Sequence, residues 1–238
     1  LIHHEDGFNE DEIEKRNWKR NAFRAQALKG ANAVVVPSTV LFEISRNEWR
    51  VAREKLHHIP NGINVALYQW PPQLGSFPGL KRKMGEVIVG TIAGLRAVKN
   101  LPRLVRAVAA AGPNVRLAIA GEGPERAAIM AEAERLGISD RLVMPGFLTE
   151  PARYVGHFDI FALSSDSEQF PISLVEAMAS GLPAISTNVG DVRNMVSEQN
   201  RRFIVGKENE AEFAEAMRQL VGSVKLRTEI GAANRILA

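Results

Sequence analysis

The residue types best suited to chemistry gather in one segment, 166–183, with the sequence DSEQFPISLVEAMASGLP. Glu168 follows an apolar stretch that ends at Leu163, and Glu176 lies within a segment typical of a helix whose first turn Pro171 would pre-set. Carboxylates accept paired hydrogen bonds from neighbouring hydroxyls, as in a ribose or a hexose. Free amides at a helix N-terminus can bind phosphate. The segment therefore predicts a site for sugar hydroxyls and phosphate together.

A simpler alternative for the two glutamates is that they only stabilise the N-terminus of the helix through its dipole. Glu176 argues against this alternative, because Val175 and Ala177 flank it in an otherwise apolar segment. A carboxylate buried there without a partner would be costly.

The loop 93–100 is a second candidate, because Arg96 and Lys99 lie in it just before a segment typical of a helix. Arginine offers a planar fork, lysine a point charge, and the helix N-terminus adds partly positive amides. Together they predict an anion site. A solvated loop with incidental charges is the alternative, and the loop alone does not choose between the two.

Gly121, Glu122 and Gly123 match half of a dinucleotide-binding fingerprint, but Arg126 occupies the place of the third glycine. No acidic residue follows that would bind a ribose, so a Rossmann NAD site is disfavoured. We expect these glycines to form a tight turn, with Pro124 at the first helical position.

These segments need a scaffold, and alternating apolar strands and helices predict one. Strands are expected at 87–92, 115–120, 142–144, 160–163, 184–186 and 203–205. Helices are expected at 101–111, 124–136, 150–155 and 172–180, and in two segments from 209 onward. The alternation predicts an α/β fold, a Rossmann-like parallel sheet with helices on both faces. Ligands of such sheets bind outside the carboxyl ends of the strands, where the candidate loops lie.

The front of the chain predicts a partial second α/β domain. A helix is expected at 11–29 with Gly30 at its end, a strand at 33–36, a helix at 40–52 capped by Ser38, and a strand that ends in the turn 58–62. Residues 1–4, without a Met, are typical of the end of a strand, so we expect a piece whose front has been removed.

The proline- and glycine-rich stretch around 68–85 predicts a linker. We therefore expect the rear portion of an N-terminal, acceptor-side domain at 1–66, a linker at 67–85 and a C-terminal domain at 86–238.

Composition excludes several classes of protein. The chain has 238 residues, 45% of them hydrophobic and 24% charged, which is typical of a globular protein. The absence of cysteine excludes disulfide scaffolds, thiolate metal sites and cysteine nucleophiles, and is compatible with the cytoplasm, where we expect the protein. No apolar run approaches the ~20 residues that span a bilayer. The net charge of +3 suits a small acidic ligand or a membrane surface.

The segment 11–27 is basic around Trp18 and could dock on anionic lipid that carries an acceptor, as a contact peripheral to the inner face of the membrane. Acidic residues at 10, 11, 12 and 14 dilute this charge, so a solvated helix face is the favoured interpretation. Few aromatic residues and the lack of a larger basic cluster disfavour nucleic-acid binding.

The two glutamates and the residues after them resemble a known family. Seven residues separate Glu168 from Glu176, the sequence AMASGLPAIST follows at 177–187, and a Val-Gly-Asp turn follows at 189–191. Further landmarks in the same order are VPS at 36–38, IPNGIN at 59–64, KN at 99–100, GEGP at 121–124 and VMPGF at 143–147. In these features nearly the whole chain resembles the retaining glycosyltransferases of family 4, which have the GT-B fold.

The resemblance implies a nucleotide-sugar donor, such as a UDP- or GDP-hexose, bound in the C-terminal domain. Glu176 would bind the ribose hydroxyls, Glu168 would contact the transferred sugar at the catalytic centre, and Lys99 with Arg96 would neutralise the departing diphosphate. The backbone near Phe147 would face the base. Amides around three further residues would lie near the sugar and diphosphate: Phe170, Pro171 and Ile172. No divalent metal and no other cofactor is expected, because the cations do that work.

The family also implies a histidine from the front domain at the catalytic centre. Aligning this chain by the end of its first strand places His4 there, whereas aligning it by Gly7 places Asp6 there. Both residues stay candidates.

The expected function is transfer of a hexose from the nucleotide diphosphate to an acceptor hydroxyl, with retention of anomeric configuration. The acceptor is unknown, a glycan or a lipid-linked saccharide. The alternatives are a GT-B-type epimerase or hydrolase of sugar nucleotides, or a non-catalytic sugar-nucleotide-binding module. Because only the end of the acceptor-side domain is expected, we predict donor binding with weak or absent transfer.

Overall fold

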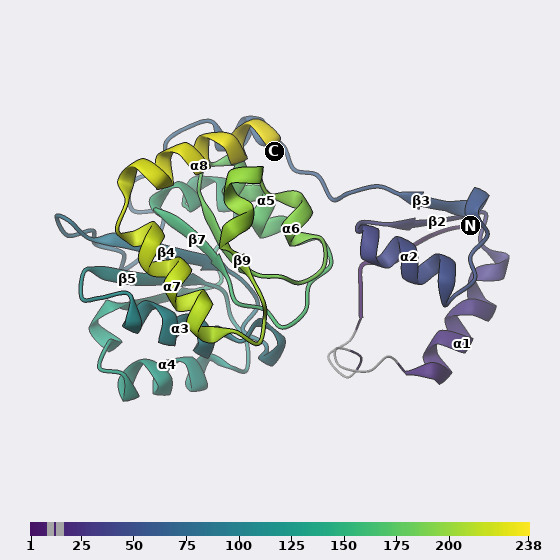
Figure 1. Ribbon diagram of the computed structural model, residues 1–238, viewed down its shortest axis with the longest axis horizontal. Helices are drawn as coiled ribbons and strands as arrows, with labels where there is room; N and C mark the ends of the chain where they lie inside the picture. Colours follow the sequence, from purple (N-terminus) through teal and green to yellow (C-terminus); the bar gives the residue numbers. More distant parts are fainter. Residues whose placement is uncertain (9–11, 13–16) are drawn as a thin grey trace.

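Two lobes, each built on a parallel sheet, make up the computed structural model, which describes residues 1–8, 12 and 17–238 (Figure 1). In the first lobe β1 (Ile2–His4), β2 (Ala33–Val36) and β3 (Leu56–His58) pair in that order, and α1 (Trp18–Ala27) and α2 (Thr39–Asn47) accompany them. The predicted strand at the very start of the chain is β1. The second lobe is larger, and its sheet has the order β6-β5-β4-β7-β8-β9.

The second lobe alternates strands and helices along the chain. Its strands are β4 (Val87–Ile92), β5 (Val115–Ala120), β6 (Leu142–Gly146), β7 (Ile160–Leu163), β8 (Ala184–Thr187) and β9 (Ile204–Val205). Its helices are α3 (Leu101–Ala110), α4 (Arg126–Arg135), α5 (Ile172–Ala179), α6 (Val192–Met195), α7 (Glu210–Val221) and α8 (Val224–Leu237). The strand pairs are parallel, and separate apolar clusters bury the two faces of the sheet. The predicted α/β fold, with a second and smaller α/β part, is confirmed.

The strands follow the sequence most closely, because short and largely apolar runs bounded by turn residues are typical of strands buried on both faces. The ranges 87–92, 115–120 and 160–163 were predicted to the residue. In β4, Val87 and Val89 enter one apolar cluster and Ile88 the other, as the alternation of strand side chains requires.

Several predicted helices end elsewhere. The helix expected at 40–52 is α2, which begins at Thr39 and ends at Asn47, because Arg50 adopts a left-handed conformation with φ 55°. The short helix expected at 150–155 is two separate 3₁₀ turns, at Pro151–Arg153 and Val155–His157, preceded by Glu150 at φ 55°. Local sequence does not reveal such left-handed residues when they are not glycine.

Two further helix boundaries also shift. Of the helix expected at 11–29, the described part is α1, which is followed by a 3₁₀ turn at Leu28–Gly30; positions 11 and 13–16 lie outside the described residues. The helix expected at 124–136 begins at Arg126, so Pro124 precedes it rather than starting it. Gly123 at φ 155° directs the chain away from helical geometry at this point.

The chain crosses between the lobes after β3 and immediately packs on the second one (Figure 1). A 3₁₀ turn, Val65–Tyr68, brings the buried Tyr68 into the apolar cluster that also contains Phe77. The Tyr68 carbonyl accepts a 3.0 Å hydrogen bond from Arg235 on α8. This turn is therefore part of the wall of the second lobe.

Gly90 shows how tightly this lobe is packed. A Cβ at this position in β4 would lie 2.1 Å from the ring of Phe158, which is itself buried against Phe77 at a centroid distance of 5.7 Å. A rigid aromatic ring in a full core cannot move aside cheaply.

We expect Gly90→Ala to lower the free energy of unfolding by about 2–3 kcal/mol, the cost of overpacking a core. Urea denaturation followed by circular dichroism measures this. The matched control is Gly30→Ala, because a Cβ at Gly30 would meet no atom within 4 Å. Equal stability of the two variants would contradict the packing argument.

Candidate functional site

The candidate site lies where two neighbouring strands end. β4 and β7 pair in parallel, with Val89 opposite Ile160, so the loops that follow them emerge side by side. Lys99, from the first loop, contacts Glu168, from the second, with Nζ 2.5 Å from Oε1. Both side chains are largely shielded, at 17% and 10% exposed. The structure thus joins the two loops that the sequence marked separately.

The main chain around Lys99 is held from both sides. Asn100 takes a left-handed conformation, φ 42°, and its Nδ2 donates a 3.0 Å hydrogen bond to Asp166 Oδ2. The Asp166 amide in turn donates to the Val98 carbonyl at 2.8 Å. Arg103 on α3 pairs with Asp166 at 2.8 Å and donates to the Ser164 carbonyl at 2.9 Å. The loop therefore presents the Lys99 ammonium in a defined place.

Glu168 is anchored by a second contact besides Lys99. Ser165 Oγ donates to Glu168 Oε1 at 2.7 Å, and Thr187 Oγ1 donates to the Ser165 carbonyl at 2.5 Å. Hydrogen bonds to an ionised carboxylate are stronger than neutral ones. The carboxylate is thus oriented by the ends of β7 and β8 together.

Glu176 has a drier environment on α5. It is 9% exposed, and its Oε1 accepts a 2.8 Å hydrogen bond from the hydroxyl of Tyr68. Burial raises the pKa of Glu176, and the Tyr68 hydrogen bond opposes part of that rise. Burial and the nearby carboxylate also raise the pKa of Tyr68, and raise the pKa of Tyr154 to about 12. One phenol occupies a single lone pair of about four, so the carboxylate can still accept paired hydroxyls.

The other residues expected near a donor differ in exposure. Phe147 is 73% exposed beyond β6, and Ile172 is 46% exposed at the start of α5. Phe170 is half-buried, and Arg96 is exposed in the loop before Lys99. Pro171 is buried and occupies the N-cap of α5 with ψ 113°, which corrects the expectation that it begins the first helical turn.

The two candidates from the front of the chain pair with each other. His4 Nε2 lies 3.3 Å from Asp6 Oδ1, and their side chains are 49% and 70% exposed. A Cβ at Gly7 would lie 3.1 Å from Cγ of Gln169, the residue after Glu168. The end of the first strand therefore adjoins the loop that carries Glu168.

The glycines at 121 and 123 lie in a close turn as expected, although Pro124 lies before α4 and not at its first position. A Cβ at Gly121 would lie 1.8 Å from the Ala93 carbonyl oxygen, and one at Gly123 would lie 2.5 Å from that of Leu95. Both glycines have positive φ, 152° and 155°. They let two backbone segments approach closely beneath the Arg96–Lys99 loop.

Comparison with known proteins assigns the family. The model of the glycosyl transferases group 1 family matches residues 76–236, which include Lys99, Glu168 and Glu176. The chain belongs to this family.

Individual relatives agree with the group 1 assignment. The N-acetyl-alpha-D-glucosaminyl L-malate synthase of Bacillus anthracis is 29% identical over 158 residues, which cover 64% of this chain and 42% of that protein. The D-inositol 3-phosphate glycosyltransferase of Segniliparus rotundus is 29% identical over 158 residues, 61% of this chain and 34% of that protein. The chain thus spans less than half the length of these relatives.

Solved structures share the fold at lower identity. HepE from Anabaena, in complex with UDP and glucose, superimposes with a TM-score of 0.84 at 20% identity, over 100% of this chain and 66% of that one. Sucrose-phosphate synthase from Thermosynechococcus elongatus gives a TM-score of 0.82 at 22% identity, over 99% and 62%. These likenesses support the GT-B arrangement of this group 1 chain.

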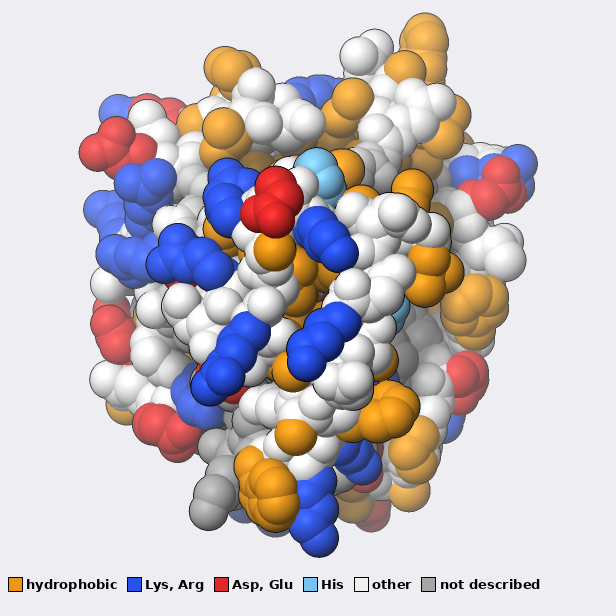
Figure 2. Space-filling view, turned by 90° about the vertical axis from the view of Figure 1, so that its right-hand side faces the viewer, with side chains coloured by type: hydrophobic (Ala, Val, Ile, Leu, Met, Phe, Trp, Pro, Cys, Tyr) orange, Lys and Arg blue, Asp and Glu red, His pale blue; other side chains and the backbone are white. Residues whose placement is uncertain are grey.

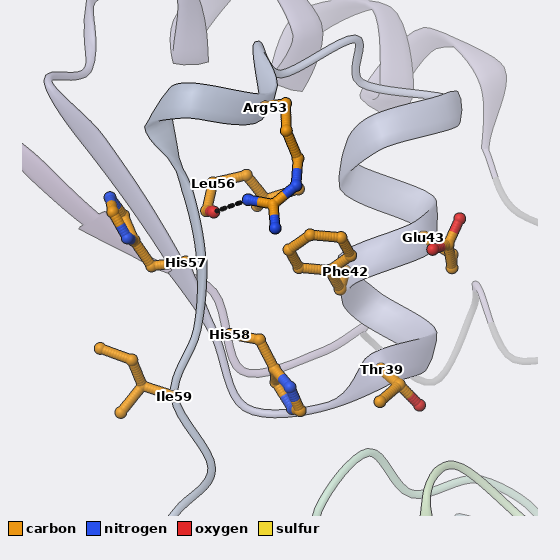
Figure 3. A pocket seen from close by; sticks show the side chains of 8 residues that line it. All are labelled: Thr39, Phe42, Glu43, Arg53, Leu56, His57, His58 and Ile59. Atoms are coloured by element: carbon orange, nitrogen blue, oxygen red, sulfur yellow. Dashed lines mark hydrogen bonds between the residues drawn. The ribbon is translucent and has the colours of Figure 1, made fainter.

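A pocket of about 490 Å³ lies in the first lobe (Figure 3). It is bounded by α2 and by the end of β3 with the residues around it. Arg53 occupies part of it, stacked over the Phe42 ring at 5.0 Å and donating to the Leu56 carbonyl at 3.2 Å. Among the residues that the structure describes, no group of three or more His, Asp or Glu could hold a metal ion.

Sequence reasoning missed Tyr68 and Asp191. Tyr68 was placed in a linker, and a single tyrosine there carries no pattern that points to Glu176, which lies 108 positions away. Asp191 was noted only as part of a turn, although its carboxylate contacts the first lobe.

We expect Tyr68→Phe to lower the free energy of unfolding at pH 7 by about 1–2 kcal/mol, because the buried Glu176 carboxylate loses its donor. Since the phenol lowers the pKa of Glu176, its removal raises that pKa further, and the cost must grow as pH rises through the titration of Glu176. Thermal unfolding of parent and variant from pH 4 to pH 8 measures the difference.

The matched control is Tyr154→Phe, because the Tyr154 hydroxyl makes a longer contact, 3.4 Å, to the Leu148 carbonyl. A cost for Tyr68→Phe that is constant with pH would contradict the coupling to Glu176.

Proposed function

We propose that this chain is the donor-binding part of a retaining, family 4-like glycosyltransferase. It would move a hexose from a nucleotide diphosphate to an acceptor hydroxyl. The observation that carries the proposal is the Lys99–Glu168 contact at the ends of β4 and β7, with the buried Glu176 on the helix that follows. Membership of the group 1 family supports it.

The charges suggest how a donor would enter. In the structure the Lys99 ammonium and the Glu168 carboxylate satisfy each other. A diphosphate would offer Lys99 a more highly charged partner, and Glu168 would then be free to accept hydroxyls of the transferred sugar. Arg96, exposed beside this position, would add a second cation. Fixed cations aimed at the departing diphosphate stabilise the charge that develops as the sugar–phosphate bond breaks.

Glu176 would bind the ribose in this scheme. Paired hydroxyls could share the carboxylate with Tyr68 or replace it, so the hydrogen bonds that burial demands would be kept. The amides around Phe170, Pro171 and Ile172 would face the sugar and diphosphate, with Pro171 itself unable to donate. The backbone near Phe147 would face the base.

Fewer residues support the proposal for the acceptor side of the site. His4 or Asp6 would take the catalytic position contributed by the first lobe, beside the loop that carries Glu168. A glycan or lipid-linked saccharide is the proposed acceptor. The relatives compared above are named as a synthase and a glycosyltransferase, so an epimerase or hydrolase is not favoured. Because the chain spans under half of those relatives, we expect nucleotide binding with weak or absent transfer.

Calorimetric titration of the chain with UDP, GDP and ADP tests the donor site. We expect one of the three to bind, and equally well with EDTA present, because the proposal assigns the diphosphate to Lys99 and Arg96 without a divalent metal. A folded sample that binds none of them would overturn the donor site, and binding lost in EDTA would overturn the metal-free assignment.

Glu176→Gln isolates the ribose contact. We expect it to weaken nucleotide binding by about tenfold, since a hydrogen bond to a charged group contributes about 1.5–3 kcal/mol. The same change should leave the protein at least as stable at pH 7, because a carboxylate whose pKa is raised by burial destabilises the fold when it ionises. The matched control is Glu134→Gln, on the exposed side of α4. Unchanged nucleotide affinity in Glu176→Gln would contradict the ribose assignment.

We also propose that α1 contacts an anionic membrane surface at the cytoplasmic side. Trp18 and Phe23 are 73% and 75% exposed, whereas Arg20 and Arg24 pair with the buried Glu12. The exposed Lys19 has its ammonium 5.8 Å from the centroid of the Trp18 ring. On this side of the molecule basic side chains predominate near the centre of the face (Figure 2). No helix in the described ranges is both long and apolar enough to cross a bilayer.

Exposed aromatic rings, one of them beside a lysine, suit the headgroup region of anionic lipid. We expect the chain to co-sediment with vesicles containing phosphatidylglycerol and not with neutral phosphatidylcholine vesicles, and the double variant Trp18→Ser/Phe23→Ser to lose most of this binding. The matched control is Leu74→Ser, which alters an exposed apolar residue outside the first lobe. Binding retained in the double variant would contradict the proposal.

A further inference from the structure

One buried carboxylate of the second lobe accepts hydrogen bonds from a helix of the first lobe. Asp191 is 3% exposed, and its Oδ2 accepts a 2.6 Å hydrogen bond from the Thr39 amide at the start of α2. Its Oδ1 accepts from the Thr39 hydroxyl at 2.7 Å and from the Val40 amide at 3.3 Å. These contacts join residues about 150 positions apart. The end of α2 that carries Thr39 faces the loops of the second lobe (Figure 3).

Three of the amides at the start of α2 have side-chain acceptors in this arrangement. The first amides of a helix have no partner within the helix. The Leu41 amide donates to the Ser38 hydroxyl at 3.0 Å, which is the cap that the sequence predicts. The Thr39 and Val40 amides donate to Asp191. A negative charge at this end also interacts favourably with the helix dipole.

Asp191 could have capped its own helix instead. It occupies the N-cap position of α6, yet its side chain makes no capping hydrogen bond there. Its carboxylate is directed to α2 alone among the helices of the described chain. The geometry thus favours a contact between lobes over a local helix cap.

The backbone at Asp191 also supports the loop that carries Glu168. The Asp191 amide donates to the Gln169 carbonyl at 3.0 Å. Gly190 has φ 52°, and a Cβ there would lie 2.5 Å from the carbonyl oxygens of both Glu168 and Gln169. The Ser38 hydroxyl donates to the Gln169 side chain at 3.0 Å, on the other side of the same loop. The loop is therefore held between residues 190–191 and the start of α2.

We propose that Asp191 is a positioning residue for the donor site: its carboxylate caps α2 across the lobes and so keeps the first lobe closed over the loop that carries Glu168. The consequence for donor binding rests on the proposed function, whereas the contact between the lobes does not. Removing the carboxylate leaves the first two amides of α2 without their acceptor, and water can satisfy them once the lobes separate. The closed arrangement is then less populated.

The distance between the lobes tests the proposal directly. The chain has no cysteine, so Gln26→Cys on α1 and Glu134→Cys on α4, both exposed, give two specific sites for a fluorescent dye pair. Single-molecule energy transfer without nucleotide then reports the populations of closed and open chains. We expect Asp191→Asn to lower the ratio of closed to open chains roughly tenfold, as loss of a charge-assisted hydrogen bond predicts. Asp191→Arg, which places a cation against the helix N-terminus, should shift the ratio further.

A variant on the other lobe makes the test independent of how Asp191 variants fold. Thr39→Pro removes both the amide and the hydroxyl that bind Asp191, yet proline is well tolerated at the first position of a helix. Ser38 is already extended, with φ −125° and ψ 153°, as a residue before proline requires. We expect Thr39→Pro to open the lobes, and Thr39→Ser, which keeps both donors, to behave as the parent.

The matched control is Asp140→Arg, an exposed position in a turn of the second lobe. If Thr39→Pro and the folded Asp191 variants keep the parental distance distribution, the proposal is wrong, whatever the nucleotide titrations show. If the lobes open, the nucleotide that binds the parent, among UDP, GDP and ADP, should bind several-fold more weakly to Asp191→Asn, in proportion to the closed population. If the lobes open but the affinity for that nucleotide is unchanged, Asp191 still joins the lobes, and its role in positioning the donor site is wrong.

Discussion

The parallel pairing of β4 with β7 is the constraint on which the candidate site depends. The two strands are separated by the whole of β5 and β6 along the chain, but their carboxyl ends emerge side by side. Only this neighbourhood lets Lys99 reach Glu168 across 69 positions of sequence. Glycines allow close packing around these strands, because Gly90 in β4 leaves room for the ring of Phe158 and Gly121 leaves room for the Ala93 carbonyl.

The buried and half-buried charged side chains at this edge of the sheet each have a hydrogen-bonding or ionic partner. Lys99 pairs with Glu168 and Arg103 with Asp166, while Glu176 has a phenol. A buried carboxylate with a neutral partner has a raised pKa and destabilises the fold at neutral pH, which is typical of functional sites. Asp191 extends this pattern across the lobes, since its partners are amides and a hydroxyl of α2.

Sequence patterns predicted the sheet well and its connections less well. Apolar runs located β4, β5 and β7 to the residue, because a strand buried on both faces tolerates little else. Helix ends were displaced where Arg50 and Glu150 take left-handed conformations, which no glycine marks in the sequence. The pairing of His4 with Asp6 leaves both alignments of the catalytic position open.

The sequence by itself determined the alternation of strands and helices, and it marked the two glutamates and the lysine as candidates, because these depend on local composition and spacing. It also determined the cap of α2 by Ser38, which spans three residues. Only the tertiary structure decided that Tyr68 meets Glu176 and that Asp191 binds α2 rather than its own helix. Those contacts join distant positions, and a partner for a buried polar group is chosen by the fold that buries it.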